Sequence, residues 1–207
     1  VTTVSNVFSN AAQNFTIEYL GTSTNTTINV LNAAVAGNVT DVVNIKYNAA
    51  TDGASVVQAL HTIAAVETIN INSTTSGTIA AGDINTLTTL TASQMQTLNI
   101  VGDTKFVITN AITTATIQTI DGSASTGGIT YSAAASTQGV LIKGSATAIT
   151  GSVQDNDNIL TGGAGLDVIT GGTGIDTLVG NEGSDTITGG DGVDTITGSA
   201  GNDVIVL

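Results

Sequence analysis

The 207-residue sequence contains no cysteine, no proline and no tryptophan, and its only aromatic residues are three tyrosines and three phenylalanines. Without cysteine no disulfide can form, and bound ions can stabilise the fold in place of disulfides. The only histidine, His61, has no second histidine or cysteine with which to complete a transition-metal site. His-Glu-x-x-His and Gly-x-Ser-x-Gly motifs are also missing, so no catalytic constellation is available and we predict that these residues form no enzyme.

Positive charge is almost absent as well. The chain has 3 basic residues against 16 acidic ones, for a net charge of −13. A nucleic-acid-binding surface needs the opposite sign, so that class of partner is excluded. No apolar run approaches the roughly 20 residues of a membrane span, and no secretory leader is recognisable at the start. Abundant Thr, Ala, Asn, Val and Ile favour β structure with small side chains.

The clearest feature present is a run of five consecutive nine-residue units over residues 162–206. Every unit has glycine at positions 1 and 4, aspartate at position 6, and leucine or isoleucine at position 8. A fixed period of this strictness indicates a solenoid. Positions 7–9 are predicted to form a short strand whose position-8 side chain points inward. The inward residues are Ile169, Leu178, Ile187, Ile196 and Ile205.

The same units predict binding of several Ca²⁺ ions. Glycine-rich turns leave backbone carbonyls exposed beside the aspartate, and hard oxygen ligands in flexible loops suit calcium. Two units make one turn, so each loop stacks on the loop two copies away. The predicted clamping pairs are Asp167 with Asp185, Asp176 with Asp194, and Asp185 with Asp203. A metal-free β-helix whose aspartates only form turns is the alternative, but it would stack like charges without a cation.

The pattern resembles the G-G-x-G-x-D-x-U-x repeat of RTX proteins, which form calcium-binding parallel β-rolls. The resemblance implies type I secretion without a cleaved N-terminal signal, and folding outside the cell. Upstream, residues 155–161 (DNDNILT) resemble a degenerate entry repeat, either a calcium site or a capping coil, in which Asp157 lies ten residues before Asp167. The candidate metal ligands are Gly163, Gly165, Asp167, Gly172, Gly174, Asp176, Asn181, Gly183, Asp185, Gly190, Gly192, Asp194, Gly201, Asp203 and Asp157.

The first half of the chain carries weaker signals. Strands are predicted at 14–20, 26–32 and 38–47 from alternation between turn residues. Residues 54–66 are predicted to form a helix because their apolar residues recur at helical spacing, which leaves His61 on a solvated face. A short helical turn is expected at 91–96. The aromatic residues Phe15, Tyr19 and Tyr47 are expected to form a local core, with carbohydrate binding as the alternative.

A looser repetition follows at 66–150. The segment ETINI (67–71) is echoed by QTLNI (96–100) and QTID (118–121), which indicates successive strands stacked in parallel. Further strands are predicted at 129–132 and 140–143. Acids beside glycine at Asp52, Asp83, Asp103 and Asp121 are either ordinary turn residues or extra calcium ligands, Asp103 and Asp121 foremost.

The predicted fold is therefore all-β: an irregular parallel β-solenoid over 1–150, with short helices near 54–66 and 91–96, that continues into an RTX β-roll over 151–207 with one shared core. The phrases LTASQMQTLNIVGD, IQTIDGSASTGGITYSA and DNDNILTGGAGLDVITGG resemble the C-terminal part of RTX-type bacterial surface-layer (S-layer) proteins, such as those of Caulobacter.

That resemblance implies a structural role at the bacterial cell surface. The chain would be secreted, fold with calcium and assemble with copies of itself into a two-dimensional lattice, with calcium bridging the copies. Anchoring to the cell would be the task of a region that is not in this chain. The alternative is a calcium-folded secretion and folding module of an RTX adhesin, toxin or hydrolase.

Overall fold

A computed structural model describes residues 2–8, 15–20, 23–31, 42–49, 55–64, 66–75, 78–79, 82–112, 114, 116–133, 136, 139–145 and 157–207. The described residues form 18 strands and no helix. The strands are β1 (Thr2–Phe8), β2 (Phe15–Tyr19), β3 (Ser23–Leu31), β4 (Val42–Ala49), β5 (Val57–Ala64), β6 (Thr68–Thr75), β7 (Ile84–Ala92), β8 (Thr97–Gly102), β9 (Lys105–Ile108), β10 (Thr119–Asp121), β11 (Ile129–Ser132), β12 (Leu141–Lys143), β13 (Ile159–Thr161), β14 (Val168–Thr173), β15 (Thr177–Glu182), β16 (Thr186–Asp191), β17 (Thr195–Ala200) and β18 (Val204–Val206).

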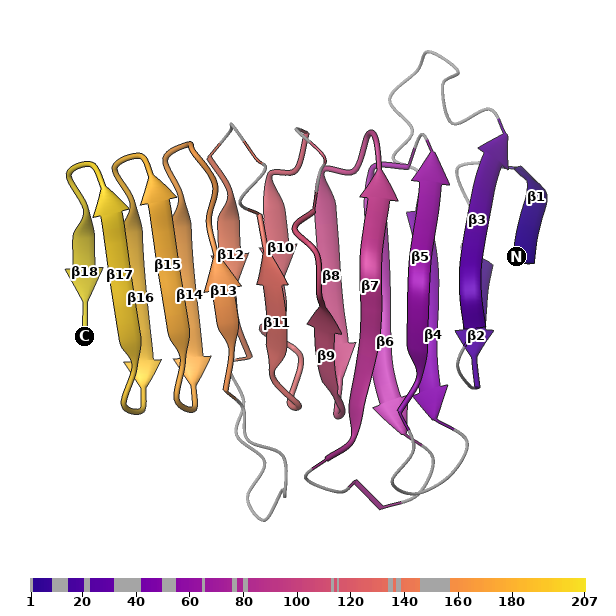
Figure 1. The fold of residues 1–207 in the computed structure, drawn as a ribbon, viewed down its shortest axis with the longest axis horizontal. Helices are drawn as coiled ribbons and strands as arrows, with labels where there is room; N and C mark the ends of the chain where they lie inside the picture. The colour runs from indigo at the N-terminus through magenta and orange to yellow at the C-terminus, as the bar shows by residue number, and fades with distance from the viewer. Residues whose placement is uncertain are drawn as a thin grey trace.

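The strands form two nine-stranded sheets that face each other. The odd-numbered strands make one sheet and the even-numbered strands make the other. Each strand pairs in parallel with the strand two places along the chain, so every turn adds one strand to each sheet, as Figure 1 shows. This architecture is a parallel β-solenoid, as predicted, and both sheets run without a break from the irregular part into the repeats.

The echoed segments of the middle region lie in the predicted parallel register. In the sheet of even-numbered strands, Thr68 pairs with Thr97, and Thr97 pairs with Thr119. Asparagines in the same segments form an outward-facing ladder, in which the amide of Asn99 donates to Asn70 Oδ1 at 2.8 Å. The echoes were recognisable because strands that stack in register place the same residue types in the same column. The strands predicted at 129–132 and 140–143 are also confirmed, as β11 and β12.

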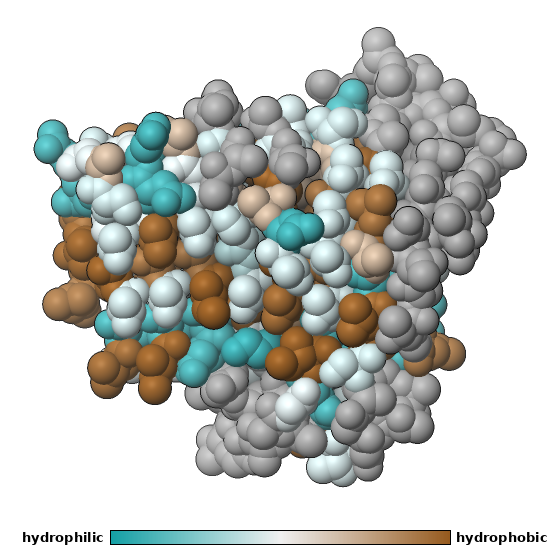
Figure 2. Space-filling model, in the orientation of Figure 1, coloured by the Kyte–Doolittle hydropathy of each residue, from teal (hydrophilic) through white to brown (hydrophobic). Residues whose placement is uncertain are grey.

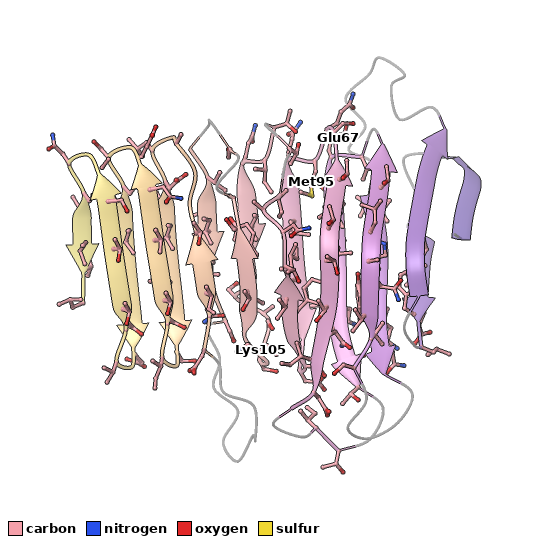
Figure 3. The ribbon with its side chains drawn as sticks, viewed as in Figure 1. Glu67, Met95 and Lys105 are labelled. Atoms are coloured by element: carbon pink, nitrogen blue, oxygen red, sulfur yellow. The ribbon has the colours of Figure 1, made fainter. Side chains whose placement is uncertain are left out.

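The length of a turn is what separates the irregular part from the roll. One turn takes 29 residues from Thr68 to Thr97 and 22 from Thr97 to Thr119, but 18 from Val168 to Thr186. The 29-residue turn has both longer strands, β6 and β7, and longer connections at the edges, whereas the extra residues of the 22-residue turn lie in the connections. Glu67 and Met95, labelled in Figure 3, both lie at one such edge, where the backbone N–H groups of Gln96 and Thr97 each donate to Glu67 O at 2.9 Å. The connections therefore stack as the strands do.

A narrow core of aliphatic side chains lies between the two sheets. In the sheet of even-numbered strands one row of paired inward residues runs nearly the whole length: Val43, Ile69, Leu98, Ile120, Ile142, Ile169, Ile187 and Ile205. Of the predicted inward residues of the repeats, Ile169, Leu178 and Ile187 are fully buried and Ile196 is partly buried. Ile205 is wrong as a core residue: it is 46% exposed, because β18 is the edge strand of its sheet.

The predicted helix at 54–66 is wrong, because these residues form strand β5. Val57–Ala64 pairs in parallel with β3 on one side and β7 on the other. The apolar spacing was misleading because two polar side chains, Gln58 and His61, take buried positions while Val57 is 37% exposed. Pairing with two neighbouring strands outweighs the local helical pattern. The short helix expected at 91–96 is wrong too: β7 extends to Ala92 and a turn follows.

The strands predicted in the first 50 residues are present with shifted ends, as β2, β3 and β4, while β1 was not predicted. Tyr19 and Tyr47 are buried, which confirms the local core and leaves their rings unavailable to a carbohydrate. The side chain of Phe15 lies outside the described part.

His61 is fully buried, so the expected solvated face is wrong. Its Nε2 lies 2.7 Å from the hydroxyl oxygen of Tyr47, and its ring stacks on Tyr19 with centroids 5.2 Å apart. The ring of Phe106 meets Tyr47 edge-on at 4.9 Å. The histidine therefore belongs to an aromatic cluster that fills the wider, N-terminal part of the core. Burial lowers the pKa of His61 to about 4, from an ordinary value of 6.5.

This burial predicts a loss of stability in mild acid. Between pH 6.5 and about 4 the unfolded chain binds a proton at His61 and the folded chain does not, so the free energy of unfolding falls as the pH falls. The difference of about 2.5 pKa units corresponds to about 3 kcal/mol. Urea unfolding of the wild type and of His61→Gln at pH 7 and pH 4.5, with calcium present, measures it. The acidic residues titrate in both proteins and cancel, so an equal pH dependence of the two would contradict the prediction.

Candidate calcium sites

The register of the roll places the position-6 residues in two columns, one at each edge where the chain passes between the sheets. Residues 18 apart lie over one another, since Val168 pairs with Thr186 and Thr177 pairs with Thr195. The first column contains Asp167, Asp185 and Asp203, and the second contains Asp176 and Asp194. The three stacked pairs predicted from the sequence are therefore formed. The loops that carry the columns connect β13–β18 at the upper and lower edges of Figure 1.

One oxygen of each carboxylate joins successive turns. Asp185 Oδ1 accepts a hydrogen bond from the backbone N–H of Asp167 at 2.9 Å. The same contact is made by Asp194 with Asp176 at 3.0 Å, and by Asp203 with Asp185 at 3.0 Å. Each aspartate thus fixes the start of a strand one turn earlier.

The other carboxylate oxygen, Oδ2, indicates which kind of ligand the site would bind. Oδ2 of Asp176 and Oδ2 of Asp185 are buried and have no hydrogen-bond partner. Oδ2 of each position-6 aspartate lies against the position-1 glycine of its own loop, where any Cβ would overlap it. A buried carboxylate oxygen without a partner is unfavourable by several kcal/mol unless a cation or a donor meets it. An oxygen-binding cation fits this requirement.

The position-4 glycines let the loops approach closely. Gly183, Gly192 and Gly201 have φ of 133°, 142° and 140°, a region that other residues rarely adopt. A Cβ on Gly183 would overlap the carbonyl oxygen of Gly165 one turn earlier, and the same holds for Gly192 over Gly174. Backbone carbonyl oxygens of stacked loops are therefore brought together beside the aspartate columns.

Four of the position-2 residues also adopt positive φ. Gly172 and Gly190 have φ of 123° and 106°, and Asn181 and Ser199, which replace glycine, have φ of 77° and 76°. Asparagine tolerates this conformation better than most residues. The Asn181 amide donates to the carbonyl of Gly162 at 2.9 Å, so the side chain ties its loop to the loop one turn earlier.

The electrostatics of the columns favour a positive ion. Burial raises the pKa of Asp167, against hydrogen bonds from the backbone of Gly163 and Val140, and the carboxylate of Asp185 raises it further. Burial likewise raises the pKa of Asp176, against hydrogen bonds from Asn158, and the carboxylates of Asp194 and Asp157 add to the effect. In the absence of a counter-charge the carboxyl groups of Asp167 and Asp176 thus resist ionisation, and a bound cation would relieve that resistance.

The donor set agrees with calcium. It consists of oxygen atoms of carboxylates and backbone carbonyls, which a hard cation of flexible coordination prefers. Among the described residues no group of three or more His, Cys, Asp or Glu side chains converges on one point. The backbone carbonyls would therefore have to supply most of the ligands. The assignment of individual residues as ligands stays a prediction.

The structure corrects the register of the entry repeat. Ile159 pairs with Thr177, so Asn158, and not Asp157, occupies position 6 opposite Asp176. Asp157 takes position 5, where its Oδ1 accepts the backbone N–H of Ile175 at 2.6 Å. The sequence carried the signal: Asn158 lies nine residues before Asp167 and directly precedes a strand, but an aspartate was expected at that position and none is there.

Two of the acids before residue 151, Asp121 and Asp103, are held by other contacts. The carboxylate of Asp121 pairs with the Lys143 ammonium at 3.3 Å and accepts the backbone N–H of Ser123 at 3.0 Å. Burial acts to raise the pKa of Asp121, but these hydrogen bonds and the lysine charge outweigh it and lower the pKa. Asp103 accepts the hydroxyl of Thr104 at 3.2 Å. Asp52 lies outside the described part. The turn role of Asp121 is thus explained without a metal.

Comparison with known proteins agrees with the geometry. Residues 154–174 and 170–205 match the model of the family 'RTX calcium-binding nonapeptide repeat (4 copies)'. No curated protein and no solved structure matched the chain. The C-terminal quarter of the chain therefore consists of RTX repeats, which bind several Ca²⁺ ions. The described part of the chain contains no helix with the length and apolar character of a membrane span.

Proposed function

We propose that this chain is the lattice-forming part of a secreted bacterial surface-layer protein, whose folding and self-assembly depend on calcium. The proposal is carried by apolar side chains that the roll leaves exposed. Position 5 of the repeats projects Leu166, Ile175 and Val193 from the loop tips, which are 62%, 60% and 79% exposed. Figure 2 shows brown, apolar atoms at the end of the molecule that the repeats form. Apolar groups presented in this way favour contact with another molecule.

Copies of the same chain are the partner that we propose. Each copy carries a net charge of −13, so two copies repel one another unless the charge is offset. Calcium bound along the aspartate columns supplies that offset close to the exposed apolar groups. The same ions would thus stabilise the fold and permit association, and further ions could bridge neighbouring copies.

A rigid body suits a lattice subunit. Both sheets run from β1 and β2 to β17 and β18, and one hydrophobic core extends from the aromatic cluster into the repeats. The roll is therefore continuous with the rest of the chain, so calcium-dependent folding would fix the orientation of the roll relative to the solenoid.

Calcium also supports a role for the repeats in export. Where calcium is scarce, charge repulsion and chain entropy oppose folding of the acidic, glycine-rich repeats, and an unfolded chain can pass a type I secretion channel. Extracellular calcium modules bind at about 10⁻⁴ to 10⁻³ M, which matches the concentration outside a cell. We infer that the repeats fold only after secretion.

Electron microscopy of the negatively stained, purified chain tests the proposal. With millimolar calcium we expect ordered sheets or regular oligomers, and with excess chelator we expect them to disperse. Circular dichroism of the same samples reports whether the chain is folded. Dispersed single particles that are folded by calcium would contradict lattice formation by this chain. They would favour the alternative, a secretion and folding module of an RTX adhesin, toxin or hydrolase.

A further inference from the structure

The second column begins with an asparagine in the place of aspartate. Asn158 occupies position 6 of the entry repeat, and its backbone N–H donates to Asp176 Oδ1 at 2.8 Å. One turn later the backbone N–H of Asp176 donates to Asp194 Oδ1 at 3.0 Å. The backbone N–H of Asn158 therefore makes the contact of a regular position-6 residue, and the chemistry of the side chain differs.

The buried amide of Asn158 joins the two halves of the solenoid. Its Oδ1 accepts the backbone N–H groups of Ile129 and Ser145, at 3.0 and 3.1 Å, both in the turn that precedes the roll. Its Nδ2 donates in the other direction, to Asp176 Oδ1 at 2.8 Å and to the carbonyl of Gly171 at 3.4 Å. The oxygen of the amide thus faces the irregular solenoid and its N–H groups face the repeats.

We propose that Asn158 closes the first loop of its column with side-chain N–H donors in the place of a calcium ion. A carboxylate oxygen and a backbone carbonyl oxygen, the two groups that its Nδ2 contacts, are ligands of the kind that calcium prefers. An amide group satisfies them without a metal. In this column the requirement for calcium therefore begins at the stacked loops of Asp176 and Asp194, and β13 folds with the calcium-independent part. This inference rests on calcium binding by the repeats and does not depend on lattice assembly.

The isosteric variant Asn158→Asp tests the proposal. It places an oxygen where Nδ2 stands, 2.8 Å from Asp176 Oδ1, so two carboxylates and a carbonyl would converge. Like charges at this distance oppose folding unless a cation lies between them. Titration calorimetry should count one more bound calcium ion per chain than in the wild type. In chelator, hydrogen exchange at the amides of Ile129 and Ser145 should accelerate on the order of tenfold, because the repulsion destabilises this turn, and calcium should reverse it.

Two variants serve as controls. Asn110→Asp adds the same charge on an exposed residue whose amide contacts Thr89, far from the repeats, and should bind calcium as the wild type does. Asn158→Ala removes the donors without adding an oxygen, so it should accelerate exchange at Ile129 and Ser145 in a way that calcium does not reverse. An unchanged ion count in folded Asn158→Asp would overturn the proposal.

Hydrogen exchange of the wild-type chain gives an independent test, which does not depend on whether a variant folds. In chelator, the amides of Ile129 and Ser145, which donate to Asn158 Oδ1, should stay protected from hydrogen exchange, while those of β16–β18 should lose their protection. If these two amides lost protection together with β16–β18, the turn of Asn158 would need calcium, and the proposal would be wrong.

Discussion

Asp185→Ala should abolish more calcium binding than any other single substitution in the roll. Asp185 is the middle member of the first column, between Asp167 and Asp203, so it belongs to two stacked pairs. Its loss removes an inward carboxylate oxygen from both. We expect two fewer bound ions per chain, and a calcium midpoint for folding, followed by circular dichroism, that moves to higher concentration. At tenfold excess over the dissociation constant each lost ion removes roughly 1.4 kcal/mol of stability, so two remove about 3 kcal/mol.

Two matched variants show whether the stacking causes the effect. Asp203→Ala touches one pair only and should remove one ion, with a smaller shift of the midpoint. Glu182→Ala removes the same charge from an exposed side chain at the end of β15 and should have the calcium midpoint of the wild type. If Asp185→Ala and Glu182→Ala had the same calcium midpoint, the assignment of the column as the calcium site would fail.

Gly183→Ala should disrupt the roll in a way that calcium cannot repair. Gly183 has a φ of 133°, and a Cβ at this position would overlap the carbonyl oxygen of Gly165 in the loop one turn earlier. The backbone strain is about 1–3 kcal/mol. The overlap adds to it, because a backbone oxygen cannot move aside as a flexible side chain can. We expect the far-ultraviolet circular dichroism signal of the roll to stay below the wild-type value even at saturating calcium.

Gly82→Ala is the matched control for this steric effect. Gly82 lies in a turn before β7, and a Cβ added there would meet no atom within 4 Å. Its calcium titration and thermal unfolding should therefore equal those of the wild type. If calcium folded Gly183→Ala fully, the loops would not need to approach as closely as the structure indicates.

The roll was predictable because its period is short and strict. Nine residues fix the turn, the aspartate and the inward aliphatic residue at once, so Asp167 and Asp185 had to stack as soon as two units formed one turn. The echo of Thr68 in Thr97 and Thr119 was readable for the same reason, since stacked strands repeat residue types in columns. Calcium followed from the chemistry of the oxygen ligands.

Other features depended on contacts that no local pattern encodes. Turns of 21 to 35 residues before the roll leave the register to strand pairing, and so β5 is a strand although its apolar residues have helical spacing. The burial of His61 depends on Tyr19 and Tyr47, which come from two other strands.

The sequence by itself determined the repeat, its aspartate columns, its metal and the all-β class, because each follows from residues close together in the chain. Only the tertiary structure decided where the calcium-dependent part begins. Asn158 resembles an ordinary turn asparagine until strand pairing places it opposite Asp176, with Ile129 and Ser145 on its other side. A side chain that contacts the turns on both sides of its own takes its role from both, and their registers are set by long-range pairing.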